Sequence, residues 1–154
     1  MRIGIHGKEV KGQQIKFVEG VFSLLTEKKA DIRVSKKFLK YLKPTRFNKF
    51  KITPFDLGSN LRSLDAFISL GGDGTLLDSI TYIGKNEIPI MGINTGRMGF
   101  LATIGRDETD KAIEHLFNGT YQTDSRTVIS LESDKKLFDG LNFSLNDFTI
   151  IKKD

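Results

Sequence analysis

The chain has 154 residues, of which 38% are hydrophobic and 28% charged, enough apolar material for a packed core in one domain or one domain plus part of another. It contains no cysteine, which excludes a disulfide framework and a cysteine-ligated zinc site. The N-terminus lacks the apolar stretch of a signal peptide, and no apolar run is long enough to span a bilayer. We therefore expect a cytoplasmic protein that has no membrane partner.

The net charge of +5 is concentrated in the segment Lys28–Lys51, which holds ten basic residues and one acid, Asp31. The basic residues are Lys28, Lys29, Arg33, Lys36, Lys37, Lys40, Lys43, Arg46, Lys49 and Lys51. Such a cluster could bind nucleic acid, because phosphates attract clustered lysine and arginine. It could instead be a solvated face that raises the local concentration of anionic nucleotides. We favour the solvated face, since charge runs are common on surfaces, and expect no nucleic-acid partner.

The first part of the chain predicts a strand, a helix and a second strand. Residues 2–7 and 31–34 are strand-like, and an apolar stripe at helical spacing lies between them. The stripe consists of Ile15, Val18, Phe22 and Leu25. This order predicts a βαβ unit with a parallel sheet. Pro44 ends any preceding helix, and residues 45–62 give no clear pattern.

The middle of the chain repeats the alternation of strand and helix. Residues 64–70 predict a buried strand that runs into a glycine-rich turn, and residues 88–93 predict another. Between them, apolar residues indicate the buried face of a helix: Leu76, Leu77, Ile80 and Ile83. Asp107 is a candidate N-cap for a further helix, which Asn118-Gly119 closes.

The pattern changes after Tyr121. Residues 126–133 and 141–151 are both β-type, and no helical pattern separates them, so they predict an antiparallel sheet. We predict an α/β nucleotide-binding domain over residues 1–122, with a Rossmann-like parallel sheet flanked by helices. Residues 123–154 would be the first strands of a truncated, β-rich C-terminal domain.

The strongest signal for chemistry is the run Gly71–Thr75, the first motif (GGDGT). At a strand-to-helix turn, glycines let phosphate oxygens approach backbone N–H groups, and the helix N-terminus favours an anion. A carboxylate would repel phosphate, so Asp73 suggests a general base, an acceptor that orients a hydroxyl, or a Mg²⁺ ligand. The alternative is an aspartate that only accepts hydrogen bonds inside a tight turn. The chain has neither a Walker A sequence nor the G-x-G-x-x-G fingerprint.

The first motif resembles the signature of NAD kinases, diacylglycerol and sphingosine kinases and, more distantly, 6-phosphofructokinases. The second motif, Gly92–Leu101 (GINTGRMGFL), is similar to the Asn-x-Gly-x-Leu-Gly-Phe-Leu pattern of NAD kinases, with Met98 in place of leucine. The third motif, Ser144–Ile150 (SLNDFTI), is similar to the place of an Asn-Glu pair in that family, with Asp147 one methylene shorter. On these motifs the chain resembles the N-terminal portion of an NAD kinase.

The resemblance implies phosphoryl transfer from ATP or polyphosphate to the 2′-hydroxyl of the adenosine ribose of NAD, with Asp73 accepting or orienting the hydroxyl proton. It implies Mg²⁺ between the donor phosphates, and a homodimer or homotetramer. The nucleotide contacts it implies are Gly72, Gly74, Thr75, Asn94, Phe100, Asn146 and Asp147. Arg97 is a further candidate, which could either add a positive charge near a phosphate or be a solvent-exposed turn residue. Because the sequence stops soon after the third motif, we expect little or no kinase activity from this chain alone.

Two other functions stay open on the sequence. A lipid kinase of the diacylglycerol type shares the first motif, although the second motif argues against it. A non-catalytic nucleotide sensor or nucleic-acid-binding module could use the segment Lys28–Lys51 instead. The two histidines carry little weight: His6 follows the first predicted strand, where we favour a turn histidine over a ligand contact, and His115 is expected to be structural.

Overall fold

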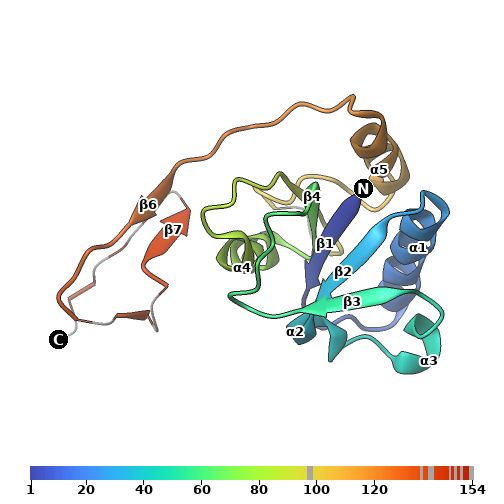
Figure 1. Cartoon of the computed structure of the whole chain (residues 1–154), viewed down its shortest axis with the longest axis horizontal. Coiled ribbons are helices and arrows are strands. Elements are labelled where there is room, and N and C mark those ends of the chain that lie inside the picture. Colours follow the sequence, from blue (N-terminus) through green and yellow to red (C-terminus); the bar gives the residue numbers. More distant parts are fainter. Residues whose placement is uncertain are drawn as a thin grey trace. The chain divides into compact units, whose positions relative to one another are not determined.

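The structure is a computed structural model that describes residues 1–96, 99–135, 137–138, 141–145, 147, 149 and 151–152. It divides into two compact units, Met1–Tyr121 and Gln122–Asp154. The first unit is an α/β fold built on a five-stranded parallel sheet, and the second contains a two-stranded antiparallel sheet (Figure 1). The predicted α/β fold class is confirmed.

The strands of the large sheet lie in the order β3-β2-β1-β4-β5, and all neighbours are parallel. They are β1 (Arg2–Gly7), β2 (Asp31–Ser35), β3 (Ile52–Phe55), β4 (Ala66–Leu70) and β5 (Ile90–Ile93). The chain first builds outward from β1 to β3 and then returns to add β4 and β5 on the other side. The direction of winding therefore reverses between β1 and β4, where Gly7 is in register with Leu70.

Helices cover both faces of this sheet. They are α1 (Gln13–Glu27), α2 (Lys36–Leu39), α3 (Pro44–Phe47), α4 (Asp73–Ile83) and α5 (Thr109–Asn118). Because side chains alternate along a strand, Ile68 packs into the cluster that also buries Phe22 and Ile113, whereas Phe67 packs into the cluster of Ile83. α1 and α5 thus share one face of the sheet, and α4 lies on the other.

Most predicted elements are present, with changed bounds. The stripe on α1 buries Val18, Phe22 and Leu25 as predicted. On α4 the predicted face is wrong at Leu77, which is 42% exposed, because Thr75 and Ser79 turn inward instead. α5 begins after Glu108 instead of Asp107, and Gly119 closes it in the left-handed conformation, as predicted.

The segment without a clear sequence pattern contains α3 and the edge strand β3. Pro44 occupies the first turn of α3, where a missing N–H costs nothing. Pro54 lies within β3, which is at the edge of the five-stranded sheet next to β2, and an edge strand tolerates proline.

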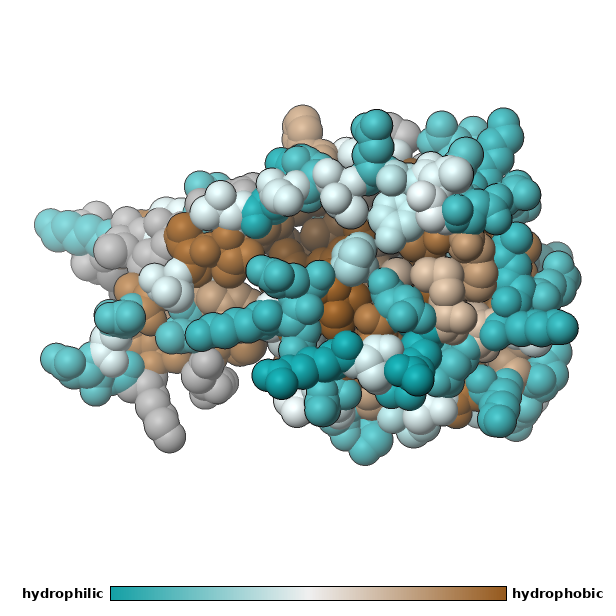
Figure 2. Space-filling model, turned by 45° about the horizontal axis from the view of Figure 1, so that its top comes forward, coloured by the Kyte–Doolittle hydropathy of each residue, from teal (hydrophilic) through white to brown (hydrophobic). Residues whose placement is uncertain are grey.

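The second unit contains β6 (Val128–Ser130) and β7 (Phe143–Leu145), which pair antiparallel as predicted. The assignment of residues 123–154 to the start of a larger β-rich domain stays a prediction. On the face shown in Figure 2, hydrophilic side chains in teal are interspersed with brown hydrophobic areas. Among the residues that the structure describes, the large apolar side chains that are more than half exposed are Leu57, Phe100, Phe138 and Ile151.

Candidate functional site

The first motif forms the turn between β4 and α4, at the carboxyl end of the sheet. This end of β4 adjoins β1, so the motif lies where the direction of winding reverses. In open α/β sheets the crevice outside the carboxyl ends at such a point is the usual place for ligands. Gly72 is the N-cap of α4 and makes no side-chain cap, so the first N–H groups of the helix are available to an anion.

The three glycines of the first motif have different roles. A Cβ at Gly71 would overlap the side chain of Thr75, which is only 3% exposed and packs back against the turn. Among the described residues, a Cβ at Gly72 would meet nothing within 4 Å, and one at Gly74 would meet only the Nζ of Lys8, at 3.5 Å. The outer side of the turn is therefore open, as a phosphate cradle requires, while its inner side is closely packed.

The carboxylate of Asp73 ties the first motif to the second. Its Oδ2 accepts a hydrogen bond from the backbone N–H of Phe100 at 2.8 Å. Its Oδ1 accepts from the N–H groups of Leu101 and Ala102 at 2.9 and 3.0 Å. A Cβ at Gly99 would overlap this carboxylate, so a glycine is needed there. The alternative considered from the sequence was an aspartate that accepts hydrogen bonds only within its own turn. In the structure the N–H groups that donate to Asp73 belong instead to a loop 27 to 29 residues away.

These bonds determine the proton affinity of Asp73. The N–H groups of Ala102, Phe100 and Leu101 lower the pKa of the carboxyl below its usual value, because each favours the ionised form. A carboxylate offers about four lone-pair sites, and three bonds occupy three of them. Among the described residues only Phe100 donates to Oδ2, so on this count one position of that oxygen can accept a bond from a ligand hydroxyl.

The second motif is held in place by backbone contacts. The Oδ1 of Asn94 accepts a bond from the N–H of Gly96 at 2.8 Å, and its Nδ2 donates to the carbonyl of Ala102 at 3.4 Å. The carbonyl of Thr95 accepts from Gln14 of α1 at 3.1 Å and also from Arg106. Asn94 is only 3% exposed, so its side chain shapes the loop from within. Gln14 and Arg106 were not anticipated, because neither is near a motif in the sequence.

Phe100 differs sharply from its neighbours in the second motif. Its side chain is 94% exposed, although its backbone N–H is bound by Asp73. Leu101 is half-buried and Ala102 is fully buried. Among the described residues of the motif, Phe100 is thus the large apolar side chain that is most exposed to solvent.

The sequence of residues 3–121 matches the profile of the ATP-NAD kinase N-terminal domain. The chain belongs to the NAD kinase family. The NAD kinase of Cytophaga hutchinsonii is 39% identical over 160 residues, covering 100% of this chain and 53% of that protein. That of Methanothermobacter thermautotrophicus is 32% identical over 144 residues, covering 92% of this chain and 48% of that protein. The chain spans about half the length of the curated NAD kinases it matches.

The crystal structure of yeast NADH kinase complexed with NADH matches the fold of this NAD kinase family member with a TM-score of 0.68. The match covers 94% of this chain and 45% of the yeast chain, at 15% sequence identity. At that identity the likeness concerns the fold alone.

Some of the predicted nucleotide contacts lie in the second unit, and others lie outside the described residues. Arg97 and Asn146 are outside them, and so is Met98. Asp147 belongs to the second unit, where it is exposed and its N–H donates to the carbonyl of Leu145 at 2.9 Å. The roles of all predicted site residues in nucleotide binding stay predictions.

Half of the basic residues of the segment Lys28–Lys51 form ion pairs. Five of the ten pair with carboxylates of the same unit, an arrangement that is common on solvated faces. The pairs are Arg33–Asp31, Lys36–Asp56, Lys37–Asp78, Arg46–Glu19 and Lys49–Glu19.

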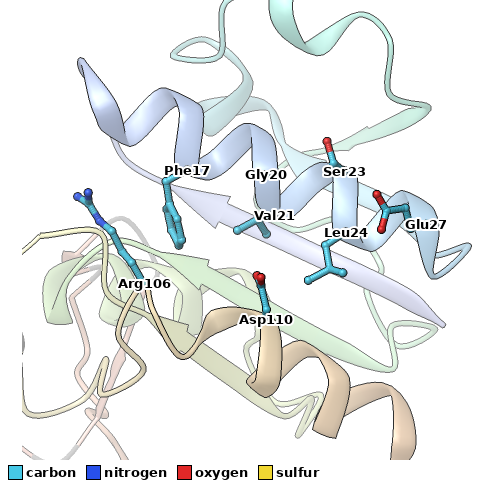
Figure 3. Close-up of a pocket in the computed structure, with 8 residues that line it drawn as sticks. All are labelled: Phe17, Gly20, Val21, Ser23, Leu24, Glu27, Arg106 and Asp110. Carbon is cyan, nitrogen blue, oxygen red and sulfur yellow. The ribbon is translucent and has the colours of Figure 1, made fainter.

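A groove of about 400 Å³ runs between α1 and the start of α5 (Figure 3). Phe17 and Arg106 point toward each other at one end, with the guanidinium 5.5 Å from the ring centre. Glu27 and Asp110 add two carboxylates to the lining. The groove shares no lining residue with the first or second motif, so we place the candidate site at the motifs instead.

Within the described residues, no group of three or more histidine, cysteine or acidic side chains is arranged to hold a metal ion. Over the same part of the chain, no helix has both the length and the apolar character needed to cross a bilayer.

Proposed function

We propose that the full-length protein phosphorylates NAD to NADP. The γ-phosphoryl group of ATP, or the terminal group of polyphosphate, passes to the 2′-hydroxyl of the adenosine ribose. The new bond joins the ribose oxygen to phosphorus, the bridging P–O bond of the donor breaks, and the hydroxyl proton is released. The observation that carries this proposal is the carboxylate of Asp73, which joins the two family motifs and keeps one acceptor position. Family membership supports the substrate class.

The bonds to Asp73 favour one of the roles considered for it. A carboxyl with a lowered pKa is a weak proton acceptor. Phosphoryl transfer proceeds through a loose transition state in which positioning and charge stabilisation supply most of the catalysis. We therefore propose that Asp73 orients the ribose hydroxyl through the remaining lone pair of Oδ2, and that the proton leaves late in the reaction.

The other predicted contacts fit around this carboxylate. Gly72 and Gly74 leave room for phosphate oxygens, and the exposed ring of Phe100 can cover an apolar part of the nucleotide. Thr75 faces inward, so we assign it to packing of the turn, with phosphate approaching the backbone instead. Asn94 supports the loop that carries Phe100.

Mg²⁺, when bound, would neutralise charge on the donor phosphates. Of the carboxylates nearest the turn, Asp73 is bonded to three N–H groups and Asp78 is paired with lysine. We therefore assign no protein cage for this ion and propose that the phosphates and water hold most of it, as is usual for magnesium. A cytoplasmic location and a homodimeric or homotetrameric assembly remain part of the proposal.

The test is NADP formation by the complete gene product and by Asp73→Asn, with Glu114→Gln on the exposed face of α5 as the matched carboxylate-to-amide control. We expect wild type and control to make NADP, and Asp73→Asn to lose kcat by roughly 100-fold while NAD affinity changes little. Normal turnover by Asp73→Asn would remove Asp73 from the mechanism. A wild-type protein that makes no NADP but phosphorylates diacylglycerol would overturn the proposed substrate.

Amide hydrogen exchange separates an orienting role from a purely structural one. The asparagine keeps one carbonyl oxygen, so the N–H groups of Leu101 and Ala102 should remain protected. The N–H of Phe100 would face the amide nitrogen and lose protection. Loss of protection at all three positions would mean that the fall in kcat reflects an unfolded loop and not the loss of an orienting acceptor.

A further inference from the structure

A lysine from a neighbouring loop lies against the first motif. Lys8 directly follows β1, and its Nζ lies 3.5 Å from the position that a Cβ on Gly74 would occupy. The two loops leave adjacent parallel strands at the carboxyl edge of the sheet. The ammonium group is therefore at the point of reversed winding, on the open side of the glycine turn, where a phosphate would approach.

A second lysine shares a carboxylate with Lys8. The Nζ of Lys37, just after β2, lies 3.1 Å from Oδ2 of Asp78 on α4, and the Nζ of Lys8 lies 3.9 Å from the same oxygen. The lysine side chains are 53% and 52% exposed, against 31% for Asp78. Two ammonium groups against one carboxylate leave a net positive charge. Each ammonium has three donors, so most of these donors are available to another anion.

Two buried polar side chains, one on β1 and one on β4, each have an atom without a hydrogen-bond partner among the described residues. His6 is fully buried, and its Nδ1 is bonded to Ser35 Oγ at 2.7 Å. Its Nε2 has no hydrogen-bond partner among the described residues and faces Asp78 Oδ2 at 3.7 Å. Ser69, the register partner of His6 on β4, is also fully buried with an unpartnered hydroxyl. Unpaired buried polar atoms are rare in folded proteins, so these two call for an explanation such as a bound water or a functional role.

We propose that Lys8 and Lys37 bind the phosphate chain of the phosphoryl donor at the mouth of the glycine turn. Asp78 holds both ammonium groups there until the donor displaces it. This inference rests on the proposed function, because it assumes that a polyphosphate chain occupies the open side of the turn. ATP and inorganic polyphosphate share this chemistry, and NAD carries a shorter diphosphate.

The first test measures binding of inorganic tripolyphosphate by calorimetry to the complete gene product, in EDTA so that no metal contributes. Lys8→Gln and Lys37→Gln should each weaken binding roughly 5- to 10-fold, as expected for one charge-assisted contact at a half-exposed site. Asp78→Asn should tighten it by a similar factor, because a competing carboxylate is removed. Lys16→Gln, at an exposed position on α1, is the matched control and should change binding less than about twofold.

The lysine variants should bind tripolyphosphate more weakly than the wild type, whereas Asp78→Asn should bind it more tightly. Equal affinities for Lys8→Gln, Lys37→Gln and Lys16→Gln would overturn the proposal, and so would weaker binding by Asp78→Asn. Thermal unfolding of each variant shows whether a loss of binding reflects a loss of folded protein. Weaker tripolyphosphate binding by a lysine variant that unfolds at the wild-type temperature supports the site.

Three titrants distinguish the sources of phosphate. ATP and tripolyphosphate should lose affinity together in Lys8→Gln, while NAD affinity is unchanged. Weakened NAD binding with unchanged tripolyphosphate binding would assign the lysines to NAD and overturn the proposal. If the wild type makes no NADP yet Lys8 and Lys37 govern tripolyphosphate binding, the phosphate site stands and the proposed function fails. If the wild type makes NADP and the KM for the donor is unchanged in Lys8→Gln, the inference alone fails.

Discussion

At the scale of single residues, this protein uses buried and half-buried polar groups to join segments that are distant in sequence. Asp73 accepts three backbone N–H groups from the second motif, and His6 connects β1 to Ser35 on β2. Each group is ionised or neutral according to its surroundings: the N–H donors favour the carboxylate, and burial favours the neutral imidazole. The pH dependence of stability should therefore report on both positions.

His6 gives the clearest prediction of this kind. Burial lowers the pKa of His6 from 6.5 to about 4, and Lys37 and Lys8 act in the same direction against the opposing charge of Asp78. Between pH 6.5 and 4 the unfolded chain binds a proton that the folded chain does not, so stability falls as the pH is lowered through this window. The full effect is on the order of 3 kcal/mol, since one pKa unit is worth ~1.4 kcal/mol.

Thermal unfolding between pH 7 and 4 measures this effect. His6→Asn retains a polar group near Ser35 but does not titrate, so its unfolding temperature should fall less steeply than that of the wild type. His115→Asn, which changes an exposed histidine on α5, is the matched control. Backbone N–H groups lower the pKa of Asp73, and Lys37 lowers that of Asp78 in spite of its burial, so both carboxylates lose their contribution to stability at the acid end of this window and below it. Identical slopes for wild type and His6→Asn would contradict the assignment.

At the scale of elements, close packing of strand, helix and loop places the two motifs together. Gly92 of β5 is central to this packing, because a Cβ there would lie 2.8 Å from Leu76 of α4 and 3.0 Å from the Cα of Ala102. The contact with Ala102 is to backbone, which cannot rotate away. β5, α4 and the end of the second motif therefore fit only around a residue without a side chain.

Gly92→Ala should destabilise the protein by about 1–3 kcal/mol, the usual cost of overpacking a core. Gly20→Ala on α1 is the matched control, since a Cβ there meets nothing within 4 Å and alanine is favoured within a helix. We expect that change to stabilise the fold by about 0.5–1 kcal/mol. Urea unfolding of both variants gives the comparison, and equal midpoints would refute the packing argument.

At the scale of the whole molecule, the first unit contains the complete parallel sheet, both core clusters and the first and second motifs. The candidate site depends on β1, β4, α4 and the second motif, all within Met1–Tyr121. The second unit carries the exposed Asp147 and its own small sheet. The contribution of the third motif to substrate binding stays a prediction.

A chain ending at Tyr121 should fold by itself. We expect cooperative thermal unfolding within about 5 °C of the 154-residue chain, since the buried core is unchanged. A chain ending at Gly105 is the control, because it lacks α5 and with it the buried Ile113 and Leu116. Each lost side chain is worth about 1.5–3 kcal/mol, so this shorter chain should unfold more than about 10 °C lower. Non-cooperative unfolding of the longer chain would show that the first unit depends on residues after Tyr121.

The fold class, most of the strands and helices, the two principal motifs and the family resemblance could all be predicted from the amino-acid sequence. These depend on local signals: apolar runs for buried strands, helical spacing for α1, and glycines at a strand-to-helix turn. Local signals failed at β3, whose proline masks an edge strand, and at Leu77, whose hydrophobicity did not decide which side of α4 is buried.

The assembly of the site could not be predicted from the sequence, because it depends on contacts between distant segments. The bonds from Asp73 to residues 100–102, the approach of Lys8 to Gly74, and the anchoring of Thr95 by Gln14 join segments that no spacing in the sequence relates. They arise because parallel strands bring their carboxyl ends to one edge of the sheet, whatever the length of chain between them. The identity of a motif residue is a property of the sequence. Its protonation, exposure and neighbours follow from which strands lie side by side.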